Sequence, residues 1–198
     1  MSDQGTTHPN IASVEQRVAA IEAAFDERGM APGEVISEFQ HTVDEQWVPQ
    51  NGARVVAKAW TDPEFRRRLL ANGRDAVAEL GLTLPRHHRH LVVLENTPTI
   101  QNVICCTLCS CTAFTIIGLP PDWYKDLEYR SRIVRQSRTV LREMGLDLPG
   151  EVEIRVWDTT ADTRYLVLPV QPPETAGWPE ERLAQIVTRD SMIGVARL

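Results

Sequence analysis

Residues 106–111 read Cys-Thr-Leu-Cys-Ser-Cys, and this short stretch holds three of the four cysteines of a 198-residue chain. The fourth cysteine, Cys105, stands directly before it. Disulfides that stabilise small secreted folds join distant segments, so their cysteines are spread along the chain. Clustering of all four cysteines in one segment therefore indicates metal or redox chemistry.

The spacing of these cysteines can place several donor atoms around one ion. Cys109 and Cys111 flank a stretch that contains the main-chain amides of Ser110 and Cys111. If both amides lose their protons, two sulfurs and two nitrogens close small fused chelate rings, which favour a square plane. Cys106 can supply a fifth ligand along the axis, and the sixth position then stays open for catalysis.

Zinc is the alternative occupant of this cysteine cluster. Structural zinc sites prefer four ligands in a tetrahedron, usually taken from two separated ligand pairs, and the chain has no second cysteine pair. Amide and thiolate donors in a plane instead suit a low-spin trivalent ion. From residues 106–111 alone, a zinc site and a chance cluster in an apolar segment stay open beside the trivalent metal.

The composition excludes several classes of function. Hydrophobic residues make up 42% of the chain and charged residues 24%, as in ordinary globular proteins. A net charge of −6 and the absence of a basic stripe argue against a nucleic-acid surface. No apolar run approaches the ~18 residues of a membrane helix, and residues 1–10 lack the apolar core of a signal peptide. We therefore expect a cytoplasmic protein without a membrane partner.

Working outward from the cysteines, helical periodicity dominates the segment that precedes them. Residues 1–10 are expected to form a disordered leader. Thr61 or Asp62 is expected to cap the last helix of this region, which Gly81 would end. The apolar spacing predicts helices over 11–28, 35–47, 53–60 and 61–80.

After Pro85 the pattern of apolar residues changes from helical spacing to one that includes strands. Alternation over residues 152–157 predicts a half-buried strand, and residues 164–170 are its expected partner. Further strands are expected over 91–94 and 99–104, and helices over 123–134, 139–144 and 179–188. The pattern predicts an α+β protein with a leader (1–10), a helical N-terminal arm (11–84) and a mixed α/β metal-binding domain (85–198).

The flanks of the cysteine cluster carry a resemblance to a known family. Residues 102–112 read NVICCTLCSCT, and residues 118–125 read GLPPDWYK. Together they are similar to the signature of nitrile hydratase α subunits, and the likeness covers nearly all of the chain after about residue 12. The resemblance implies a layered α/β domain that carries a metal-binding loop, here called the claw (residues 106–111), and hydration of nitriles to amides at a low-spin Co(III) centre.

The resemblance implies a role for each residue of the claw. Cys106 would be the axial thiolate, Cys109 a sulfinic acid and Cys111 a catalytic sulfenic acid. The amides of Ser110 and Cys111 would be equatorial ligands. Thr107 in place of Ser is the variant associated with cobalt, with Fe(III) as the alternative. The implied partners are a β subunit (a single or split chain, whose arginines contact the oxidised cysteines), a metal-delivery activator protein and the nitrile substrate.

Other residues near the claw are candidates for the pocket wall or for bracing the loop: Thr107, Thr112, Phe114, Trp123, Arg130 and Arg132. The segment Ala113–Phe114 departs from the Thr-Pro-Trp-Pro pattern usual in the family, which points to an unusual or bulky substrate such as a nucleoside nitrile. Cys105 is expected to be a buried apolar residue. The histidines His87, His88 and His90 are expected in a solvated loop, with a metal-loading site as the alternative.

Two further functions stay open. The metal-bearing subunit of thiocyanate hydrolase shares the claw and its flanks, and it converts thiocyanate to carbonyl sulfide and ammonia. The sequence does not separate the two reactions, because the pocket is shared with a partner subunit. A zinc-binding interaction module without enzyme activity is the third candidate, which zinc without sulfur oxidation would support.

Overall fold

The computed structural model describes residues 12–198, and contacts between residues divide the chain into two compact units, Met1–Thr42 (unit 1) and Val43–Leu198 (unit 2). The leader predicted over residues 1–10 lies outside the described residues. Within the described part of the chain, none of the helices combines the length and the apolar composition that crossing a membrane requires.

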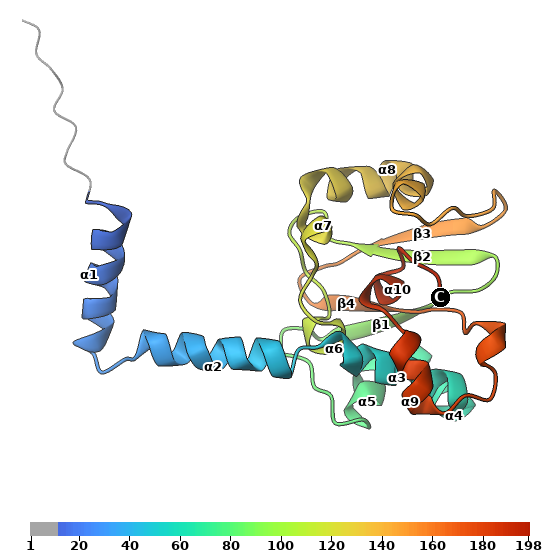
Figure 1. Ribbon diagram of the computed structural model, residues 1–198, viewed down its shortest axis with the longest axis horizontal. Coiled ribbons are helices and arrows are strands. Elements are labelled where there is room, and N and C mark those ends of the chain that lie inside the picture. Colours follow the sequence, from blue (N-terminus) through green and yellow to red (C-terminus); the bar gives the residue numbers. More distant parts are fainter. Residues whose placement is uncertain (1–11) are drawn as a thin grey trace, which may run out of the picture. The chain divides into compact units, whose positions relative to one another are not determined.

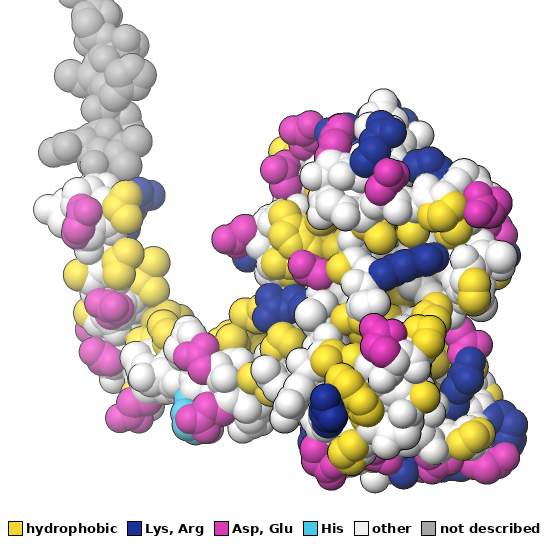
Figure 2. Space-filling view, turned by 45° about the vertical axis from the view of Figure 1, so that its right-hand side comes forward, with side chains coloured by type: hydrophobic (Ala, Val, Ile, Leu, Met, Phe, Trp, Pro, Cys, Tyr) yellow, Lys and Arg dark blue, Asp and Glu magenta, His cyan; other side chains and the backbone are white. Residues whose placement is uncertain are grey.

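Unit 1 holds helix α1 (Val14–Asp26) and most of α2 (Pro32–Glu45). A capping box starts α1, because Ser13 Oγ accepts from the Gln16 amide at 3.2 Å while the Gln16 side chain accepts from the Ser13 amide at 2.9 Å. Neither helix buries a residue, and Figure 2 shows hydrophobic side chains on their surface. Val35 and Ile36 are 65% and 67% exposed.

The strands of unit 2 form two parallel pairs (Figure 1): β1 (His90–Glu95) with β4 (Thr163–Leu168), and β2 (Ile100–Cys105) with β3 (Glu153–Asp158). The prediction that residues 152–157 pair with 164–170 is therefore wrong. Leu166, Val167 and Leu168 are all buried, so β4 lies in the interior beside β1. The alternating strand β3 instead pairs with β2 and packs against helix α8 (Leu127–Glu143).

Helices cover the strand pairs, which confirms the α+β class and the layered α/β arrangement (Figure 1). Helices α4 (Pro63–Ala71) and α5 (Gly73–Ala78) pack on β1, and α3 (Pro49–Thr61) packs on α9 (Glu180–Ile186). Helix α10 (Arg189–Ile193) contacts β4 and β2, and a 3-10 turn, η1, spans Pro173–Thr175. The buried core of unit 2 joins these elements, including Val56, Leu69 and Leu166.

The single helix predicted over residues 61–80 is two helices. Asn72 ends α4 and caps α5, because its side chain accepts from the Asp75 amide at 3.3 Å. Gly73 follows, and a Cβ atom there would lie 2.5 Å from the carbonyl oxygen of Leu91. Because Gly73 has no side chain, the chain at this break lies closer to β1 than a residue with a Cβ atom would allow.

The two packing units meet at Thr42 and Val43, whereas the predicted domain boundary lies at residue 84. Helices α3, α4 and α5 belong to the same unit as the strands, because their apolar faces are buried in its core. The apolar pattern changes near residue 84 because the chain passes there from the helices α3, α4 and α5 to the strands of unit 2.

The strand pair β2–β3 sets the place of the claw. Cys105, the last residue of β2, is in register with Asp158, the last residue of β3. The claw therefore leaves the sheet at the carboxyl ends of two parallel strands, where sites in layered α/β proteins commonly form. The chain then returns through two short helices, α6 (Phe114–Ile117) and α7 (Asp122–Lys125).

Candidate metal centre

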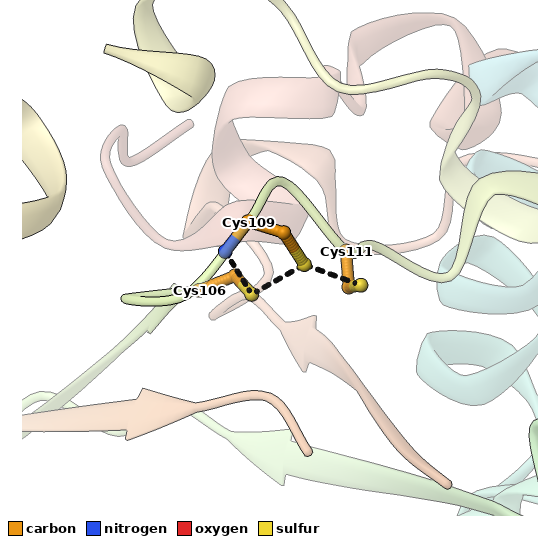
Figure 3. Close-up of side chains that lie close together, drawn as sticks. All are labelled: Cys106, Cys109 and Cys111. Atoms are coloured by element: carbon orange, nitrogen blue, oxygen red, sulfur yellow. Dashed lines mark hydrogen bonds between the residues drawn. The ribbon is translucent and has the colours of Figure 1, made fainter. Parts of the chain in front are cut away.

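The three cysteines of the claw point toward one another (Figure 3). The sulfurs of Cys106 and Cys109 are 3.2 Å apart, and those of Cys109 and Cys111 are 2.8 Å apart. All three sulfurs lie within 4.8 Å of one another, and none of the cysteines forms a disulfide. The loop thus gathers three thiols where a single ion could contact them.

The separations of the sulfurs favour one coordination geometry over another. With metal–sulfur distances of ~2.3 Å, two thiolates lie ~3.3 Å apart at a right angle and ~3.8 Å apart at a tetrahedral angle. The measured 3.2 Å and 2.8 Å are nearer to the right angle. The donor set therefore fits an ion with square or octahedral preference better than tetrahedral zinc.

The main chain of the claw is also suited to metal binding. No main-chain hydrogen bond among the described residues uses the amide of Ser110 or Cys111 as donor to a carbonyl. The amide of Cys109 lies 3.4 Å from the sulfur of Cys106 and donates toward it, and the amide of Cys111 also donates toward this sulfur. The residues present therefore fit a trivalent metal with mixed sulfur and nitrogen ligands.

Burial and hydrogen bonding act in opposite directions on the thiols. Burial disfavours the Cys106 thiolate, but hydrogen bonds from Thr159 and from the amides of Cys111 and Cys109 outweigh it and lower the pKa of Cys106 to about 7. For Cys111, burial and the contact with Cys109 raise the pKa to about 12. Cys106 thus offers a thiolate more readily than Cys111 does.

Asp158 anchors the claw to the end of β3, and sequence reasoning missed it. Its carboxylate accepts from the Thr107 amide at 2.9 Å and from the Thr107 hydroxyl at 2.5 Å. These two hydrogen bonds fix both the main chain and the side chain of Thr107, which lies between Cys106 and Leu108. Asp158 is 51 residues from Thr107, so only the β2–β3 register could have indicated it.

Three side chains hold carbonyl oxygens of the claw region. The Arg130 guanidinium donates to the Cys109 carbonyl at 2.9 Å, and the Tyr124 hydroxyl donates to the Cys111 carbonyl at 3.1 Å. The Tyr129 hydroxyl donates to the Ile104 carbonyl at 3.0 Å, at the end of β2. Arg130 thus lies where a brace for the loop was predicted.

An open cavity of about 530 Å³ lies beside the claw. Phe114 forms part of its wall and packs against Trp47 and His88, with ring centroids 4.5 Å and 5.1 Å away. Thr112 is buried there, and its hydroxyl finds no hydrogen-bond partner in the described part of the chain. The lining is a mixture of claw, aromatic and charged residues: His87, His88, Cys109, Ser110, Cys111, Thr112, Phe114, Leu119, Pro120, Lys125 and Arg164.

His88 and Arg164 are wall residues that sequence reasoning did not assign to the site. His88 is only 1% exposed, although a solvated loop was expected for it, and its Nδ1 has no hydrogen-bond partner within residues 12–198. Burial is the main cause that lowers its pKa to about 4, and the nearby positive charges of Arg164, His87 and Arg74 add to it. Arg164 also favours the anionic form of Cys111, against the larger effect of burial.

Other predicted site residues lie outside the cavity wall. Arg132 pairs with Glu128 at 2.9 Å and Glu143 at 2.7 Å, and no contact with the claw is found among the described residues. Trp123 packs edge-on against Tyr129, with ring centroids 4.9 Å apart. Cys105 is fully buried and burial raises its pKa to about 12, in line with an inert apolar role.

Comparisons with known proteins agree with this geometry. The profile of the family "Nitrile hydratase, alpha chain" matches residues 12–196. The α subunit of the low-molecular-weight cobalt-containing nitrile hydratase from Rhodococcus rhodochrous is 44% identical, over 98% of this chain and 93% of its own. The γ subunit of thiocyanate hydrolase from Thiobacillus thioparus is 43% identical, over 86% of this chain and 74% of its own.

A solved structure is similar over nearly the whole fold. It is a double mutant of the Fe-type nitrile hydratase from Comamonas testosteroni Ni1, with a TM-score of 0.88 and 57% identity over 93% of this chain and 89% of that one. A layered α/β unit with a three-thiol loop at the end of a strand defines a metal-binding enzyme subunit. The chain belongs to the nitrile hydratase α-chain family.

Proposed function

We propose that this chain is the metal-bearing α subunit of a nitrile hydratase and that its claw holds one Co(III) ion. The observation that carries the proposal is the convergence of three thiols within 4.8 Å of one another, with 3.2 Å between the sulfurs of Cys106 and Cys109 and 2.8 Å between those of Cys109 and Cys111. The ligands would be the sulfurs of Cys106, Cys109 and Cys111 and the amide nitrogens of Ser110 and Cys111.

Cobalt is proposed over iron for two reasons. Thr107 stands where the cobalt-associated variant of the claw carries Thr, and a cobalt-containing relative is 44% identical. A similar structure of Fe type shows that a closely related scaffold serves the other metal. Metal analysis of the purified protein therefore decides between the two ions.

The order of exposure of the three thiols supports different degrees of oxidation. Cys109 is exposed, Cys111 is half-buried and Cys106 is buried. With dioxygen as the oxidant, oxidation of a metal-bound thiolate follows its accessibility, so Cys109 would reach the sulfinic acid, Cys111 the sulfenic acid, and Cys106 would stay a thiolate.

The cavity places the reacting groups. A bound trivalent ion would supply Lewis acidity that polarises the C≡N bond of the substrate. Cys111 lies in the wall of the cavity, so its sulfenate oxygen, or a water that this oxygen orients, would attack the nitrile carbon while a π pair of the C≡N bond moves to nitrogen. One water is consumed in either case: it supplies the two protons that nitrogen gains, and its oxygen either enters the amide or replaces the oxygen that leaves sulfur. Phe114 and His88 present ring edges and faces to the same space, which suits a flat or bulky substituent on the nitrile.

A β subunit is the proposed partner, because the claw lies at an apolar surface. Leu108 at the tip of the claw is 90% exposed, and Leu127 and Val134 on α8 are 73% and 47% exposed. Apolar groups grouped in this way mark protein interfaces. A metal-delivery activator protein belongs to the proposal as well, since loading requires deprotonation of two amides. We propose a cytoplasmic location, where clustered thiols stay reduced before loading.

The experiment is expression of the chain with its partner subunit in cobalt medium, followed by metal analysis, intact mass and amide formation from aliphatic and aromatic nitriles. We expect one cobalt for each α chain, a mass gain of three oxygens, and turnover. The Cys111→Ala variant should lose turnover. A variant with unchanged turnover would remove the sulfenate from the mechanism, and four-coordinate zinc would overturn the proposal.

Hydrolysis of thiocyanate is the second candidate, supported by the 43% identical relative that is named for this reaction. The same preparation, assayed with thiocyanate, should release ammonia and carbonyl sulfide if this candidate is correct. Turnover of thiocyanate without turnover of nitriles would replace the first proposal with the second. Zinc bound without sulfur oxidation would support the non-enzymatic module instead.

A further inference from the structure

Thr159 follows directly after β3, and the pairing of β2 with β3 continues as far as this residue. The register of the two strands ends with Cys105 opposite Asp158, and the Thr159 amide still donates to the Cys105 carbonyl at 3.0 Å. One step further along both chains, Thr159 therefore stands opposite Cys106, the residue proposed as the axial ligand.

The two residues at the end of β3 lie on opposite sides of the chain. Asp158 is exposed and holds Thr107, whereas Thr159 is buried, with 7% of its surface exposed. Side chains alternate between the two faces along an extended strand, and residues that pair across neighbouring strands share a face. Thr159 and Cys106, which is 2% exposed, thus lie together on the interior side of the claw.

The hydroxyl of Thr159 is a buried donor without a conventional partner. Within residues 12–198 it forms no hydrogen bond with a nitrogen or oxygen atom, although a buried hydroxyl that stays unpaired lowers stability. The group that it reaches is the Cys106 sulfur. Burial opposes the thiolate there, and the hydrogen bond from Thr159 is foremost among the contacts that outweigh burial and lower the pKa of Cys106 to about 7.

A hydrogen bond to a metal-bound thiolate changes the metal as well as the sulfur. The donor draws electron density from the sulfur, so the thiolate gives less of it to the ion, and the ion becomes a stronger Lewis acid. Metal–thiolate sites are tuned by the hydrogen bonding around their sulfurs in this way. In the loaded claw, oxygen bound to Cys109 and Cys111 would withdraw electron density from those two sulfurs, whereas Cys106 would stay unoxidised.

We propose that Thr159 is a positioning residue whose hydroxyl donates a hydrogen bond to the axial thiolate of Cys106 and so raises the Lewis acidity of the bound metal. The inference rests on the proposed function, because it requires a trivalent ion held by Cys106. Thr159 thereby does for the sulfur that burial protects from oxidation what bound oxygen does for Cys109 and Cys111.

A purely structural role is the competing account, in which Thr159 only fills space at the end of β3 with its branched side chain. Two substitutions separate the accounts, because Thr159→Val keeps the shape and removes the hydroxyl, whereas Thr159→Ser keeps the hydroxyl and removes the methyl group. Thr175→Val is the matched control for the loss of a buried hydroxyl. Thr175 is 2% exposed and donates to the Pro172 carbonyl at 2.7 Å, and it is not a residue of the claw cavity.

The test compares the wild-type protein with Thr159→Val, Thr159→Ser and Thr175→Val, each expressed with the partner subunit in cobalt medium. The readouts are cobalt for each chain, the thiolate-to-cobalt absorption band, the Co(III)/Co(II) reduction potential, and amide formation from an aliphatic nitrile. We expect Thr159→Val to shift the band to longer wavelength, to lower the reduction potential and to reduce turnover by about 10-fold. Thr159→Ser and Thr175→Val should keep the wild-type band and potential.

Two results would overturn the inference. One is a Thr159→Val protein with the wild-type band and reduction potential, whatever its turnover. The other is an equal shift in Thr159→Val and Thr159→Ser, which would show that packing rather than the hydroxyl matters. If Thr159→Val does not fold, as circular dichroism would show, the comparison of Thr159→Ala with Thr159→Ser decides in the same way, because these two differ only by the hydroxyl. A wild-type protein that binds zinc, or no metal, would instead remove the proposed function.

Discussion

At the scale of single residues, the claw depends on side chains that are far away in the sequence. Asp158 holds the amide and the hydroxyl of Thr107, and Arg130 holds the carbonyl of Cys109. These contacts fix the main chain at two places in the claw that follow Cys106. Residues that orient metal ligands in this way commonly change metal affinity when they are replaced.

Replacement of Asp158 by Asn should loosen the claw. Asn keeps one acceptor oxygen, and its NH2 group can meet the Thr107 hydroxyl only as a donor, so the negative charge that strengthens both contacts is lost. We expect the free energy of unfolding to fall by only about 1 kcal/mol, because the pair is exposed, while cobalt retention falls by about 10-fold. Chelator challenge and urea denaturation measure the two effects, and Thr107→Val is the control that removes the hydroxyl contact alone. Unchanged cobalt retention would contradict the role of the anchor.

His88 should make stability depend on pH. In the unfolded chain His88 has the usual histidine pKa of about 6.5, whereas burial lowers the pKa of folded His88 to about 4. The free energy of unfolding should therefore be flat above about pH 6.5 and fall by up to about 3 kcal/mol as the pH drops toward 4. Urea denaturation of the metal-free protein at about pH 7 and about pH 4.5 measures this. His88→Phe, which keeps the ring contact with Phe114, should lack most of this dependence, and an identical slope would contradict it.

The sequence predicted the local part of the site and missed the distant part. Cys106, Cys109, Ser110 and Cys111 lie within six consecutive residues, so their spacing indicated a metal chelate, although from this stretch alone zinc and a chance cluster stayed open. Arg164 comes from a strand more than fifty residues away, in a register that no local pattern encodes. Its neighbour in space, His88, lies in a sequence run rich in Arg and His that is typical of solvated loops, yet it is buried.

At the scale of elements, close approach of backbones positions the strands that carry the claw. Gly194 ends α10 with a φ of +94°, and a Cβ atom there would lie 1.9 Å from the Asn102 carbonyl oxygen in β2. Gln101, next to Asn102, donates to the Gly194 carbonyl at 2.8 Å. The end of α10 thus lies directly against the strand that leads into Cys106.

Gly194→Ala should therefore destabilise the protein strongly. The added methyl group meets backbone rather than a flexible side chain, and the left-handed conformation is strained for Ala. We expect a loss of about 3 kcal/mol or more in the free energy of unfolding, measured by urea denaturation. Gly150→Ala is the matched control, because nothing lies within 4 Å of its Cβ position. Equal stabilities of the two variants would contradict the close packing of α10 on β2.

Element types were more predictable than their partners. Periodicity indicated the helices and strands on both sides of the claw, because each burial pattern repeats within a few residues. The parallel pairs β1–β4 and β2–β3 were not predicted, since pairing depends on which strands are buried on both faces. The break at Asn72 was missed because its cause, the contact of Gly73 with Leu91, lies in a different element.

At the scale of the whole molecule, the two units differ in how they use apolar residues. Unit 2 buries its apolar side chains in one core, whereas α1 and α2 bury none of their residues (Figure 2). Helices with a large exposed apolar face gain their stability from packing against a partner. In the proposed heteromer, that partner is the β subunit.

Loss of apolar groups from unit 1 should affect assembly rather than the fold of unit 2. Replacing Ile21, Val35 and Ile36 by Ser removes side chains that are 57%, 65% and 67% exposed. We expect co-purification of the β subunit to fall by about 10-fold or more, with little change in the thermal unfolding of unit 2. Glu22→Gln with Glu38→Gln on the same helices is the control. Normal assembly of the Ser variant would contradict a partner at this face.

The position of Gly194 against β2 bears on how this protein could be engineered. A mutant library meant to widen the range of nitriles accepted should leave residues 101, 102 and 194 unchanged. At these residues the end of α10 packs closely against β2, and most substitutions would destabilise the fold. Substitutions are better directed to Phe114, Leu119 and His87. These residues line the cavity beside the claw, and they are half-buried or exposed. Selection can then change the shape of the cavity for new substrates, while the packing of α10 against β2, which supports the claw, stays unchanged.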